Sequence, residues 1–209
     1  MNRLIKICGL KSPENIRQVV SLQPDMIGFI FYPKSPRYLN NPKDIAKLYI
    51  PPSVKRIGVF VNEAKDIILE KVKIYQLQGV QLHGDESPAL CLALKQKNLR
   101  VIKAFSVSHP EDLKKCALYE GFADYFLFDT KTQGYGGSGE KFDWEIINAY
   151  KGLTPFILSG GISPEDTEAI LSFKHARFAG VDLNSRFEVS PGEKNIESLK
   201  QFLQKIKGS

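Results

Sequence analysis

Residues 124–141 read DYFLFDTKTQGYGGSGEK, and they contain the unit from which the architecture can be inferred. The apolar and aromatic run YFLF, residues 125–128, has the length and composition of a short buried strand. It ends at Asp129, and a glycine-rich loop at residues 130–139 follows before a helix that we expect near Asp143. In α/β barrels, a buried strand that ends at a carboxylate and opens into a loop forms part of the active site. Asp129 is therefore a candidate site residue, with the alternative that it caps a turn.

An apolar run of strand length alternates with an amphipathic helical segment eight times along the chain. The expected strands are residues 4–8, 26–31, 56–61, 79–82, 100–105, 124–128, 156–158 and 178–183. The expected helices are residues 13–22, 42–49, 63–76, 87–97, 110–120, 143–150, 164–173 and 193–207. Three of these helices begin with a serine followed by a proline, a pair that caps a helix and fits its first turn. These serines are Ser12, Ser87 and Ser163.

Eight consecutive βα units without a linker between them predict an α/β fold of one domain, a (β/α)8 TIM barrel over residues 1–209. The alternative is a doubly wound open sheet, which usually has a Rossmann-type glycine fingerprint after its first strand. The corresponding stretch here, CGLKSPEN at residues 8–15, lacks that fingerprint. The barrel is therefore the preferred fold, and its active site is expected at the C-terminal ends of the strands.

The composition is that of a globular protein, with 43% hydrophobic and 25% charged residues. No apolar run approaches the ~20 residues that a membrane span needs, and the apolar part of the N-terminal MNRLIKICGL is too short for a signal peptide. We therefore expect a cytoplasmic protein without membrane contacts. The net charge of +6 is spread along the chain, whereas nucleic-acid binding favours a concentrated basic patch. No nucleic-acid partner is expected.

The three cysteines, Cys8, Cys91 and Cys116, have no CxxC spacing, and the three histidines are scattered along the chain. In a chain without an export signal, such cysteines argue against a disulfide framework. The spacing also argues against a structural zinc site. No metal is expected.

The first expected strand ends at Cys8. Alternation along it places Lys6 and Cys8 on one face and two isoleucines on the other, and the isoleucines suit packing against helices. Lys6 and Cys8 are therefore expected inside the barrel, where the lysine needs an acidic partner, with Asp129 and Asp182 as candidates. A cysteine beside a cation can have a lowered pKa and act as a base or nucleophile, whereas most buried cysteines only pack. Both interpretations of Cys8 stay open at this point.

A stiff loop after the second strand carries Arg37. Its sequence YPKSPRY, residues 32–38, contains two prolines that restrict where the arginine points. A guanidinium on a rigid loop over the barrel mouth suits bidentate binding of a carboxylate or phosphate. A solvated surface arginine is the alternative.

The fourth strand continues into the stretch GVQLHGDE, residues 79–86, in which Gln81 and His83 lie on one face. Polar groups two residues apart on a buried strand indicate an inward pair that lines a site. A lone histidine is also commonly structural, so contact of His83 with a ligand is one of two interpretations.

The loops after the seventh and eighth strands predict a phosphate-binding site. They contain LSGGI at residues 158–162 and GVDLNS at residues 180–185. Glycines let the backbone approach a ligand, and backbone N–H groups near a short helix N-terminus form a phosphate cradle. In TIM barrels that cradle belongs to these two loops, whereas a Gly-Gly pair by itself is often only a turn. The candidate residues are Gly160, Gly161, Asp182, Asn184 and Ser185.

Together these stretches resemble the phosphoribosylanthranilate isomerase family of tryptophan biosynthesis. The matching stretches are KICGL (6–10), GFIFYPKSPRYL (28–39), GVFVNE (58–63), VQLHGDE (80–86), LFDTKTQGYGGSGEKFDW (127–144), LSGGI (158–162) and GVDLNS (180–185). They span nearly the whole chain in order, and they are highly specific as a set, though each alone is modest. No extra domain is expected, which corresponds to the stand-alone form of the enzyme and not to its fusion with indole-glycerol-phosphate synthase.

The resemblance implies an Amadori rearrangement of N-(5-phosphoribosyl)anthranilate to 1-(2-carboxyphenylamino)-1-deoxyribulose 5-phosphate, without a cofactor or metal. The family's catalytic cysteine and aspartate fall on Cys8 and Asp129, and its arginine for the anthranilate carboxylate falls on Arg37. Its phosphate loops fall on Gly160–Gly161 and on Asp182–Ser185. The expected partner is this small-molecule substrate, and both a monomer and a homodimer are compatible with the barrel.

Two other functions compete with this one. A histidine-pathway isomerase performs the same rearrangement on a bis-phosphorylated ribotide, but it would be expected to use an aspartate where Cys8 stands and to have two phosphate sites on symmetric half-barrels. A catalytically silent barrel would bind a phosphorylated metabolite or a protein partner. Such a relative would be free to lose the acid, the base, the arginine or a phosphate loop, whereas candidates for all of them are present here.

Arg186 departs from the family pattern. It stands in the stretch NSRFE, residues 184–188, where relatives commonly have a small residue such as glycine. Because arginine adopts a positive φ less readily than glycine, the local turn is expected to differ. We also expect the added cation to tighten phosphate binding.

Overall fold

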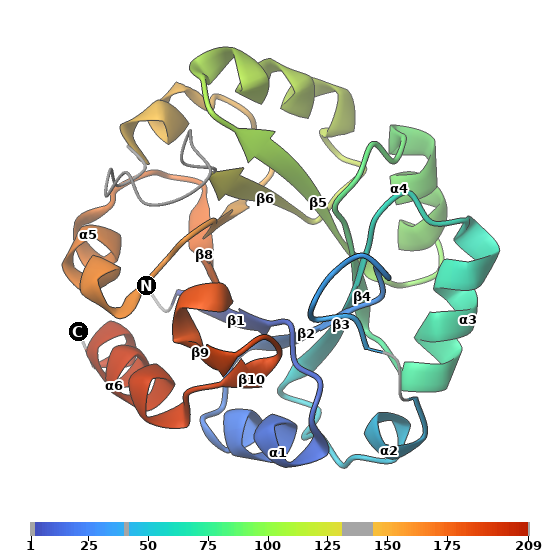
Figure 1. Ribbon diagram of the computed structural model, residues 1–209. Helices are drawn as coiled ribbons and strands as arrows, with labels where there is room; N and C mark the ends of the chain where they lie inside the picture. The colour runs from blue at the N-terminus through green and yellow to red at the C-terminus, as the bar shows by residue number, and fades with distance from the viewer. Residues whose placement is uncertain (1–2, 40–41, 131–143, 209) are drawn as a thin grey trace.

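The chain folds into a closed barrel of parallel strands (Figure 1). The computed structural model describes residues 3–39, 42–130 and 144–208. The strands pair in sequence order, and β1 pairs with β8 to close the barrel. Their bounds are β1 Leu4–Cys8, β2 Met26–Ile30, β3 Lys55–Phe60, β4 Gly79–Leu82, β5 Arg100–Val107, β6 Tyr125–Thr130, β7 Phe156–Ser159 and β8 Phe178–Leu183. The predicted eight-stranded barrel is confirmed.

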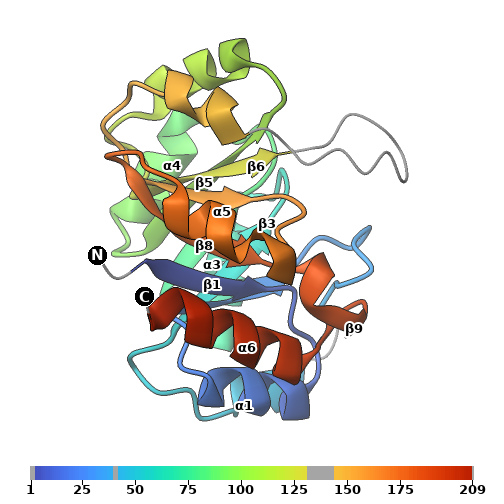
Figure 2. The ribbon, with the colours of Figure 1, turned by 90° about the vertical axis from the view of Figure 1, so that its left-hand side faces the viewer.

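Helices form a layer around the strands (Figures 1 and 2). Their bounds are α1 Pro13–Ser21, α2 Pro42–Ala46, α3 Lys65–Tyr75, α4 Pro88–Lys95, η1 Pro110–Tyr119, η2 Trp144–Ala149, η3 Pro164–Asp166, α5 Thr167–Ser172, η4 Ser185–Phe187 and α6 Ile196–Lys207, where η denotes a 3-10 helix. The predicted helices therefore lie in the expected places. No helix in the described part of the chain has the length and apolar character needed to cross a membrane.

Two of the predicted helices, η1 and η2, are 3-10 helices, which make a tighter turn than an α-helix. In η1 the residues that pack inward are Leu113, Cys116 and Tyr119. They are three residues apart, and a helix with three residues per turn places all of them on one face. The spacing of its apolar residues is therefore compatible with the 3-10 form of η1.

The predicted serine caps are confirmed. At Ser12 and Ser87 the side-chain hydroxyl accepts a hydrogen bond from the backbone N–H three residues later, at 3.2 and 3.3 Å. At Ser163 the backbone N–H and the hydroxyl both donate to the Asp166 carboxylate, at 2.9 and 2.8 Å. Each contact satisfies polar groups that the start of a helix leaves unpaired.

The segment before the last helix differs from the prediction. The sequence predicts a helix from Glu193, whereas the structure has an antiparallel hairpin of β9, Glu188–Ser190, and β10, Glu193–Lys194, before α6 begins at Ile196. The hairpin turn includes Gly192, whose φ of 91° is readily adopted by glycine. Figure 2 shows β9 on the side of the molecule toward which the barrel strands run. The hairpin therefore lies beside the expected site.

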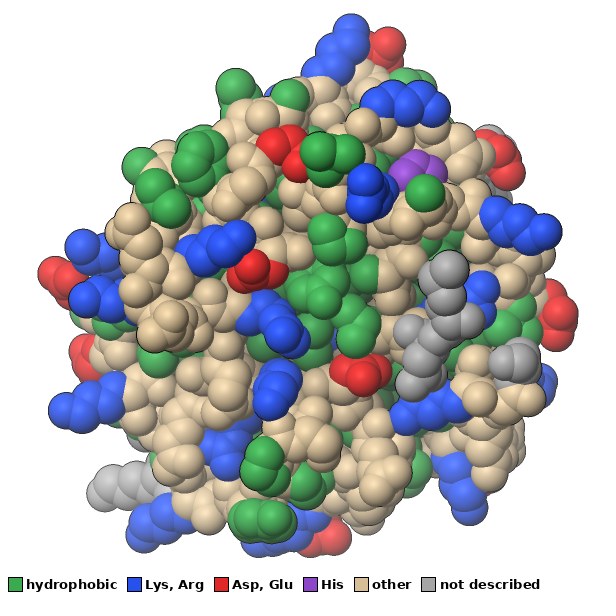
Figure 3. Space-filling view, turned by 180° about the vertical axis from the view of Figure 1, so that it is seen from behind, with side chains coloured by type: hydrophobic (Ala, Val, Ile, Leu, Met, Phe, Trp, Pro, Cys, Tyr) green, Lys and Arg blue, Asp and Glu red, His purple; other side chains and the backbone are tan. Residues whose placement is uncertain are grey.

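Side chains that alternate along the strands fill the interior of the barrel. Toward the N-terminal ends they form an apolar cluster of Met26, Ile57, Ile102, Ala104, Leu127 and Ile157, separate from the core under the helices. Figure 3 shows that end of the molecule, with hydrophobic side chains near its middle and charged side chains around them. Farther along the strands the same interior register becomes polar, with Lys6, Cys8, Gln81, Asp129, Ser159 and Asp182. The polar side chains of the interior thus lie toward the C-terminal end of the barrel, where the sequence places the candidate site.

Aromatic packing outside the barrel fixes the orientation of β6. Phe126 and Phe128 are fully buried on its outer face, and the ring of Phe128 lies 5.3 Å from that of Tyr150. Leu127 belongs to the interior cluster, so Asp129 also points inward. A shift of one residue in the pairing register of β6 would bring Phe126 and Phe128 into the barrel and turn Asp129 outward. The outer core therefore holds the candidate acid in place.

Candidate active site

Cys8 lies at the C-terminal end of β1, and Lys6 precedes it on the same interior face. Both are buried, as the alternation predicts. The Nζ of Lys6 forms an ion pair with Oδ1 of Asp182 at 2.9 Å, and the two residues are directly paired in the β1–β8 register. Of the two acidic partners that the sequence left open, the structure therefore selects Asp182 and not Asp129. The pair is almost fully buried, so each charge offsets the desolvation of the other.

The pKa of the Cys8 thiol is raised above its usual value. Burial is the largest cause, since it disfavours the thiolate. The Lys6 ammonium pulls this pKa downward, Asp182 pushes it upward, and Lys194 adds a smaller downward effect. The lowered pKa that a neighbouring cation suggested is therefore not found, because desolvation outweighs Lys6 and its partner Asp182 opposes it. Burial therefore favours the neutral thiol of Cys8 over the thiolate.

Two glycines make room around Cys8. A Cβ at Gly28 of β2 would lie 2.6 Å from the Cys8 Sγ, so only glycine accommodates the thiol at this distance. Gly9 follows Cys8 with a φ of 82°, and a Cβ there would lie 2.7 Å from Cδ of Arg37 and 2.8 Å from Oδ1 of Asn184. Arg37 and Asn184 therefore flank the backbone immediately after the cysteine.

Gln81, His83 and Asp129 form a hydrogen-bonded chain across the ends of β4 and β6. The Gln81 Nε2 lies 2.9 Å from His83 Nδ1, and His83 Nε2 lies 3.3 Å from Asp129 Oδ2. With the glutamine amide donating to Nδ1, the neutral imidazole carries its proton on Nε2 and donates it to the carboxylate. The predicted inward pair of Gln81 and His83 is thus brought together with Asp129.

Gln81 has an unpaired oxygen. The residue is 2% exposed, and its Oε1 is buried without a hydrogen-bond partner among the described residues. A buried polar atom without a partner is unfavourable unless a ligand or water satisfies it. The atom is therefore available to a hydroxyl or amine group of a bound molecule.

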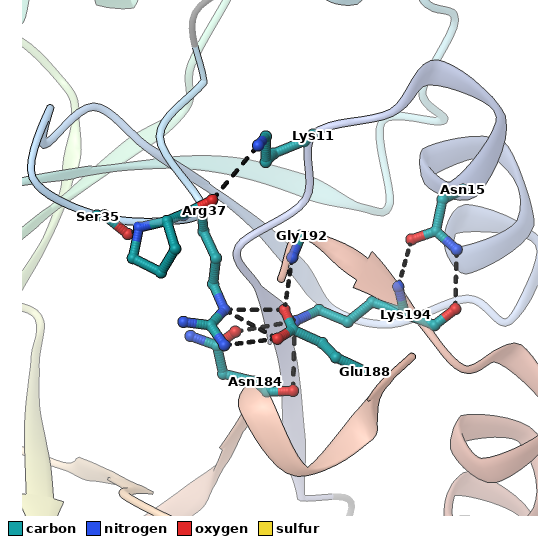
Figure 4. Close-up of polar contacts among 9 residues, drawn as sticks. Lys11, Asn15, Ser35, Arg37, Asn184, Glu188, Gly192 and Lys194 are labelled. Atoms are coloured by element: carbon teal, nitrogen blue, oxygen red, sulfur yellow. Dashed lines mark hydrogen bonds and ion pairs between the residues drawn. The ribbon is translucent and has the colours of Figure 1, made fainter. Parts of the chain in front are cut away.

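Arg37 forms a bidentate ion pair with Glu188 of β9 (Figure 4). The Nε lies 2.9 and 3.0 Å from the two carboxylate oxygens, and Nη2 lies 2.6 Å from Oε2. The Nζ of Lys194 lies 2.6 Å from the other oxygen of Glu188 and 2.8 Å from Oδ1 of Asn184. The predicted solvated alternative for Arg37 is thus excluded, since its guanidinium belongs to a cluster at the barrel mouth.

Glu188 and Lys194 were missed by the sequence reasoning, which placed a helix at residues 193–207. The available signal was the stretch SPGE, residues 190–193, because Pro-Gly between short polar runs marks a turn. That turn would have predicted a hairpin in front of the helix and drawn attention to the charged residues on either side of it.

The two candidate phosphate loops lie where they were predicted. Gly160 and Gly161 have φ values of 91° and 67°, and η3 begins shortly after them. In the other loop, Asn184 accepts one hydrogen bond from Lys194 through its side chain and one through its backbone oxygen, and Ser185 is exposed. The side chain of Asp182 points to Lys6 instead of to this loop. Only its backbone is therefore available for a phosphate.

The glycine-rich segment after Asp129 lies largely at residues 131–143, outside the described residues. In the rest of the chain that the structure describes, no three histidine, cysteine, aspartate or glutamate side chains are placed to hold a metal ion.

A family model for N-(5'-phosphoribosyl)anthranilate (PRA) isomerase matches residues 5–205. The chain belongs to this family. The match covers the barrel from β1 to α6, so it includes every strand end that carries a candidate residue. The activity is therefore isomerisation of N-(5'-phosphoribosyl)anthranilate in tryptophan biosynthesis, as the sequence predicted. The alternatives of a histidine-pathway isomerase and a silent binding barrel are not favoured by this match.

Individual members of the PRA isomerase family are similar to this chain along nearly their whole length. The N-(5'-phosphoribosyl)anthranilate isomerase of Parabacteroides distasonis is 50% identical over 209 residues, which cover 97% of this chain and 93% of the relative. A crystal structure of a PRA isomerase in complex with reduced 1-(o-carboxyphenylamino)-1-deoxyribulose 5-phosphate has a TM-score of 0.83 and 35% identity, with 99% and 100% of the two chains covered. A crystal structure of monomers generated from the dimeric enzyme of Thermotoga maritima has a TM-score of 0.81 and 34% identity, covering 99% and 100%.

Proposed function

We propose that Cys8 and Asp129 perform the Amadori rearrangement of N-(5-phosphoribosyl)anthranilate as general base and general acid. Asp129 protonates the furanose oxygen while the C1–O bond breaks, and the anthranilate nitrogen forms an iminium ion with C1. The thiolate of Cys8 then removes the proton from C2, and the electrons of that bond neutralise the iminium ion to give the enolamine. Tautomerisation of the enolamine yields the ketone, 1-(2-carboxyphenylamino)-1-deoxyribulose 5-phosphate.

The observation that carries this proposal is the placement of the two residues on one barrel mouth. Cys8 is the last residue of β1, and Asp129 lies on the inner face of β6, one residue before its end. In the closed sheet β7 and β8 separate these two strands. A sugar ring between them would have the acid on one side and the base on the other. The contact of 3.3 Å between His83 Nε2 and Asp129 Oδ2 supports the role of the acid, because it fixes the position of the carboxyl group near the end of β6.

The remaining candidates bind the substrate in this proposal. Arg37 receives the anthranilate carboxylate, which suits a guanidinium that lies beside the backbone of Cys8. The free Oε1 of Gln81, together with His83, faces the ribose hydroxyls. The phosphate is held by backbone N–H groups of the two loops that contain Gly160, Gly161, Asp182, Asn184 and Ser185. No cofactor or metal takes part in the steps.

Turnover of freshly prepared N-(5-phosphoribosyl)anthranilate tests the proposal directly, because the loss of anthranilate fluorescence follows the reaction. We expect the purified chain to convert the substrate without added metal or cofactor, in the presence of a chelator. Binding of the substrate without any conversion would contradict the mechanism and would identify a binding barrel.

Arg186 is expected to strengthen binding of the phosphate. It is exposed on η4, Ser185–Phe187, and its backbone does not need a positive φ. An exposed cation contributes a modest attraction that salt screens, so Arg186→Gly should raise KM about two- to fivefold and make KM less dependent on ionic strength. Steady-state kinetics between low and high salt measure both effects. An unchanged KM with an unchanged salt dependence would show that Arg186 has no part in phosphate binding.

We infer an assembly of one or two copies of the chain. The Thermotoga maritima relative is described as dimeric, and monomers have been generated from it, so both states are compatible with this barrel in that enzyme. Sedimentation equilibrium of the purified protein distinguishes the masses of the two states. A larger assembly would contradict this inference.

We also propose a cytoplasmic location. Residues 4–8, which are mostly apolar, form the largely buried strand β1, so they belong to the barrel. Fractionation of cells that express the chain should recover it with cytoplasmic markers. Recovery in an exported fraction would overturn the proposal.

A further inference from the structure

Glu188 is held at the mouth of the barrel by several hydrogen bonds. Its carboxylate accepts hydrogen bonds from Arg37, from the Nζ of Lys194 at 2.6 Å and from the backbone N–H of Gly192 at 3.1 Å. The side chain is 4% exposed, and the bonds from Arg37 and Lys194 contribute to lowering the pKa of the carboxyl group against the effect of burial. Glu188 is therefore a fixed, charged support (Figure 4).

Of the three charged side chains in this cluster, only Arg37 reaches the open mouth. Its side chain is 19% exposed, whereas those of Glu188 and Lys194 are 4% and 0% exposed. Glu188 contacts the Nε and Nη2 atoms of the guanidinium. The Nη1 group has no hydrogen-bond partner among the described residues. Because a guanidinium has five N–H donors in one plane, the contact with Glu188 fixes that plane and leaves the Nη1 side available.

The charges of the cluster do not cancel. Arg37 and Lys194 are cations and Glu188 is an anion, so the cluster keeps one net positive charge. The neighbouring ion pair of Lys6 and Asp182 adds no net charge. One positive charge in excess favours an anion at the mouth. Burial lowers the pKa of the Lys194 ammonium, whereas its ion pair with Glu188 favours the charged form.

We propose that Glu188 is a positioning residue for carboxylate recognition, holding one side of the Arg37 guanidinium so that the other side meets the carboxylate of the substrate. Lys194 offsets the charge of Glu188 in this arrangement. The inference rests on the assignment of Arg37 to the anthranilate carboxylate. It extends that assignment to a residue that acts through Arg37 without touching the substrate.

The test compares two ligands that differ only in the carboxylate. One is reduced 1-(o-carboxyphenylamino)-1-deoxyribulose 5-phosphate, and the other is the same compound without the carboxyl group. Calorimetry gives the Kd of each ligand for the wild type and for Glu188→Gln. The carboxylate preference is the Kd of the ligand without the carboxyl group divided by the Kd of the ligand with it. Glu193→Gln is the matched control, since Glu193 lies in the same hairpin and its carboxylate contacts Ser12 instead of Arg37.

Glu188→Gln should lower the carboxylate preference about tenfold or more, with little change in the Kd of the ligand without a carboxylate. Simple charge attraction predicts the opposite sign, because removal of an anion would strengthen carboxylate binding. An increased or unchanged preference, or an equal loss of affinity for both ligands, therefore overturns the proposal. If Glu188→Gln does not fold, Glu188→Asp retains the charge but shortens the reach, and it should lower the preference in the same direction.

A double-mutant comparison shows whether Glu188 acts through Arg37. Arg37→Met should remove most of the carboxylate preference, and adding Glu188→Gln to it should change the remaining preference less than about twofold. A further large loss in the double variant would contradict positioning through Arg37. If the wild type never turns over the substrate but Glu188→Gln still lowers the carboxylate preference, only the proposed catalytic function is contradicted. Normal turnover with an unchanged preference would contradict this inference alone.

Discussion

Cys8→Ala should reduce kcat for N-(5-phosphoribosyl)anthranilate by at least ~100-fold, because a general base typically contributes about 10²–10⁴-fold. The thiol lies at the end of β1, and the alanine side chain cannot accept the C2 proton. KM should change much less, since Arg37 and the phosphate loops remain. The loss of anthranilate fluorescence measures both constants. The matched control is Cys91→Ala, which removes a buried thiol from α4, outside the barrel interior.

The pH dependence provides a second readout for Cys8. Burial raises the pKa of its thiol in the protein without substrate, so the thiolate is a minor species at neutral pH. If the thiolate is the base, kcat/KM should rise with pH through the neutral and weakly alkaline range, toward the raised pKa. A flat profile over that range, or a Cys8→Ala variant of nearly full activity, would show that another group removes the proton.

Asp129→Asn should also reduce kcat by at least ~100-fold, because an amide has the size of the carboxyl group but cannot donate its acidic proton. Its hydrogen-bonding position beside His83 can be kept, so the substrate should still bind. Direct titration with the reduced product analogue checks this, since binding must survive while turnover is lost. Asp85→Asn, an exposed aspartate on the loop after β4, serves as the control.

The outcome for Asp129→Asn separates two roles of the carboxylate. A loss of turnover with retained binding supports an acid that acts in the ring-opening step. A parallel loss of binding and turnover would instead assign Asp129 to holding His83 or the substrate, and activity close to the wild type would remove it from the mechanism.

The alternation of residues along the strands was enough to predict the direction of several candidate side chains. Lys6 and Cys8 point into the barrel because the two isoleucines of β1 pack outward. Asp129 points inward for the same reason, because Phe126 and Phe128 face the helices. The prediction for Lys6 and Cys8 succeeded because side-chain direction in a strand has a period of two, which is a local property of the backbone, and the same property explains the observed direction of Asp129. The serine caps are local as well, and they were also predicted correctly.

The hairpin of β9 and β10 could not be predicted in the same way. Its strands are three and two residues long, which is too short for an alternating pattern to be recognised. The apolar periodicity of α6 was extended across it, and Glu188 and Lys194 were therefore not considered. Pairing between Glu188 and Arg37 joins residues 151 positions apart, and no local pattern contains that information.

The sequence by itself therefore determined the barrel, the inward direction of Cys8 and Lys6, and the family. Only the tertiary structure decided that Lys6 pairs with Asp182, that Glu188 holds Arg37, and that the pKa of Cys8 is raised. The physical reason is the range of the interactions. Strand periodicity and helix caps depend on neighbours in the chain, whereas ion pairs and desolvation depend on which distant elements meet and how completely they exclude water.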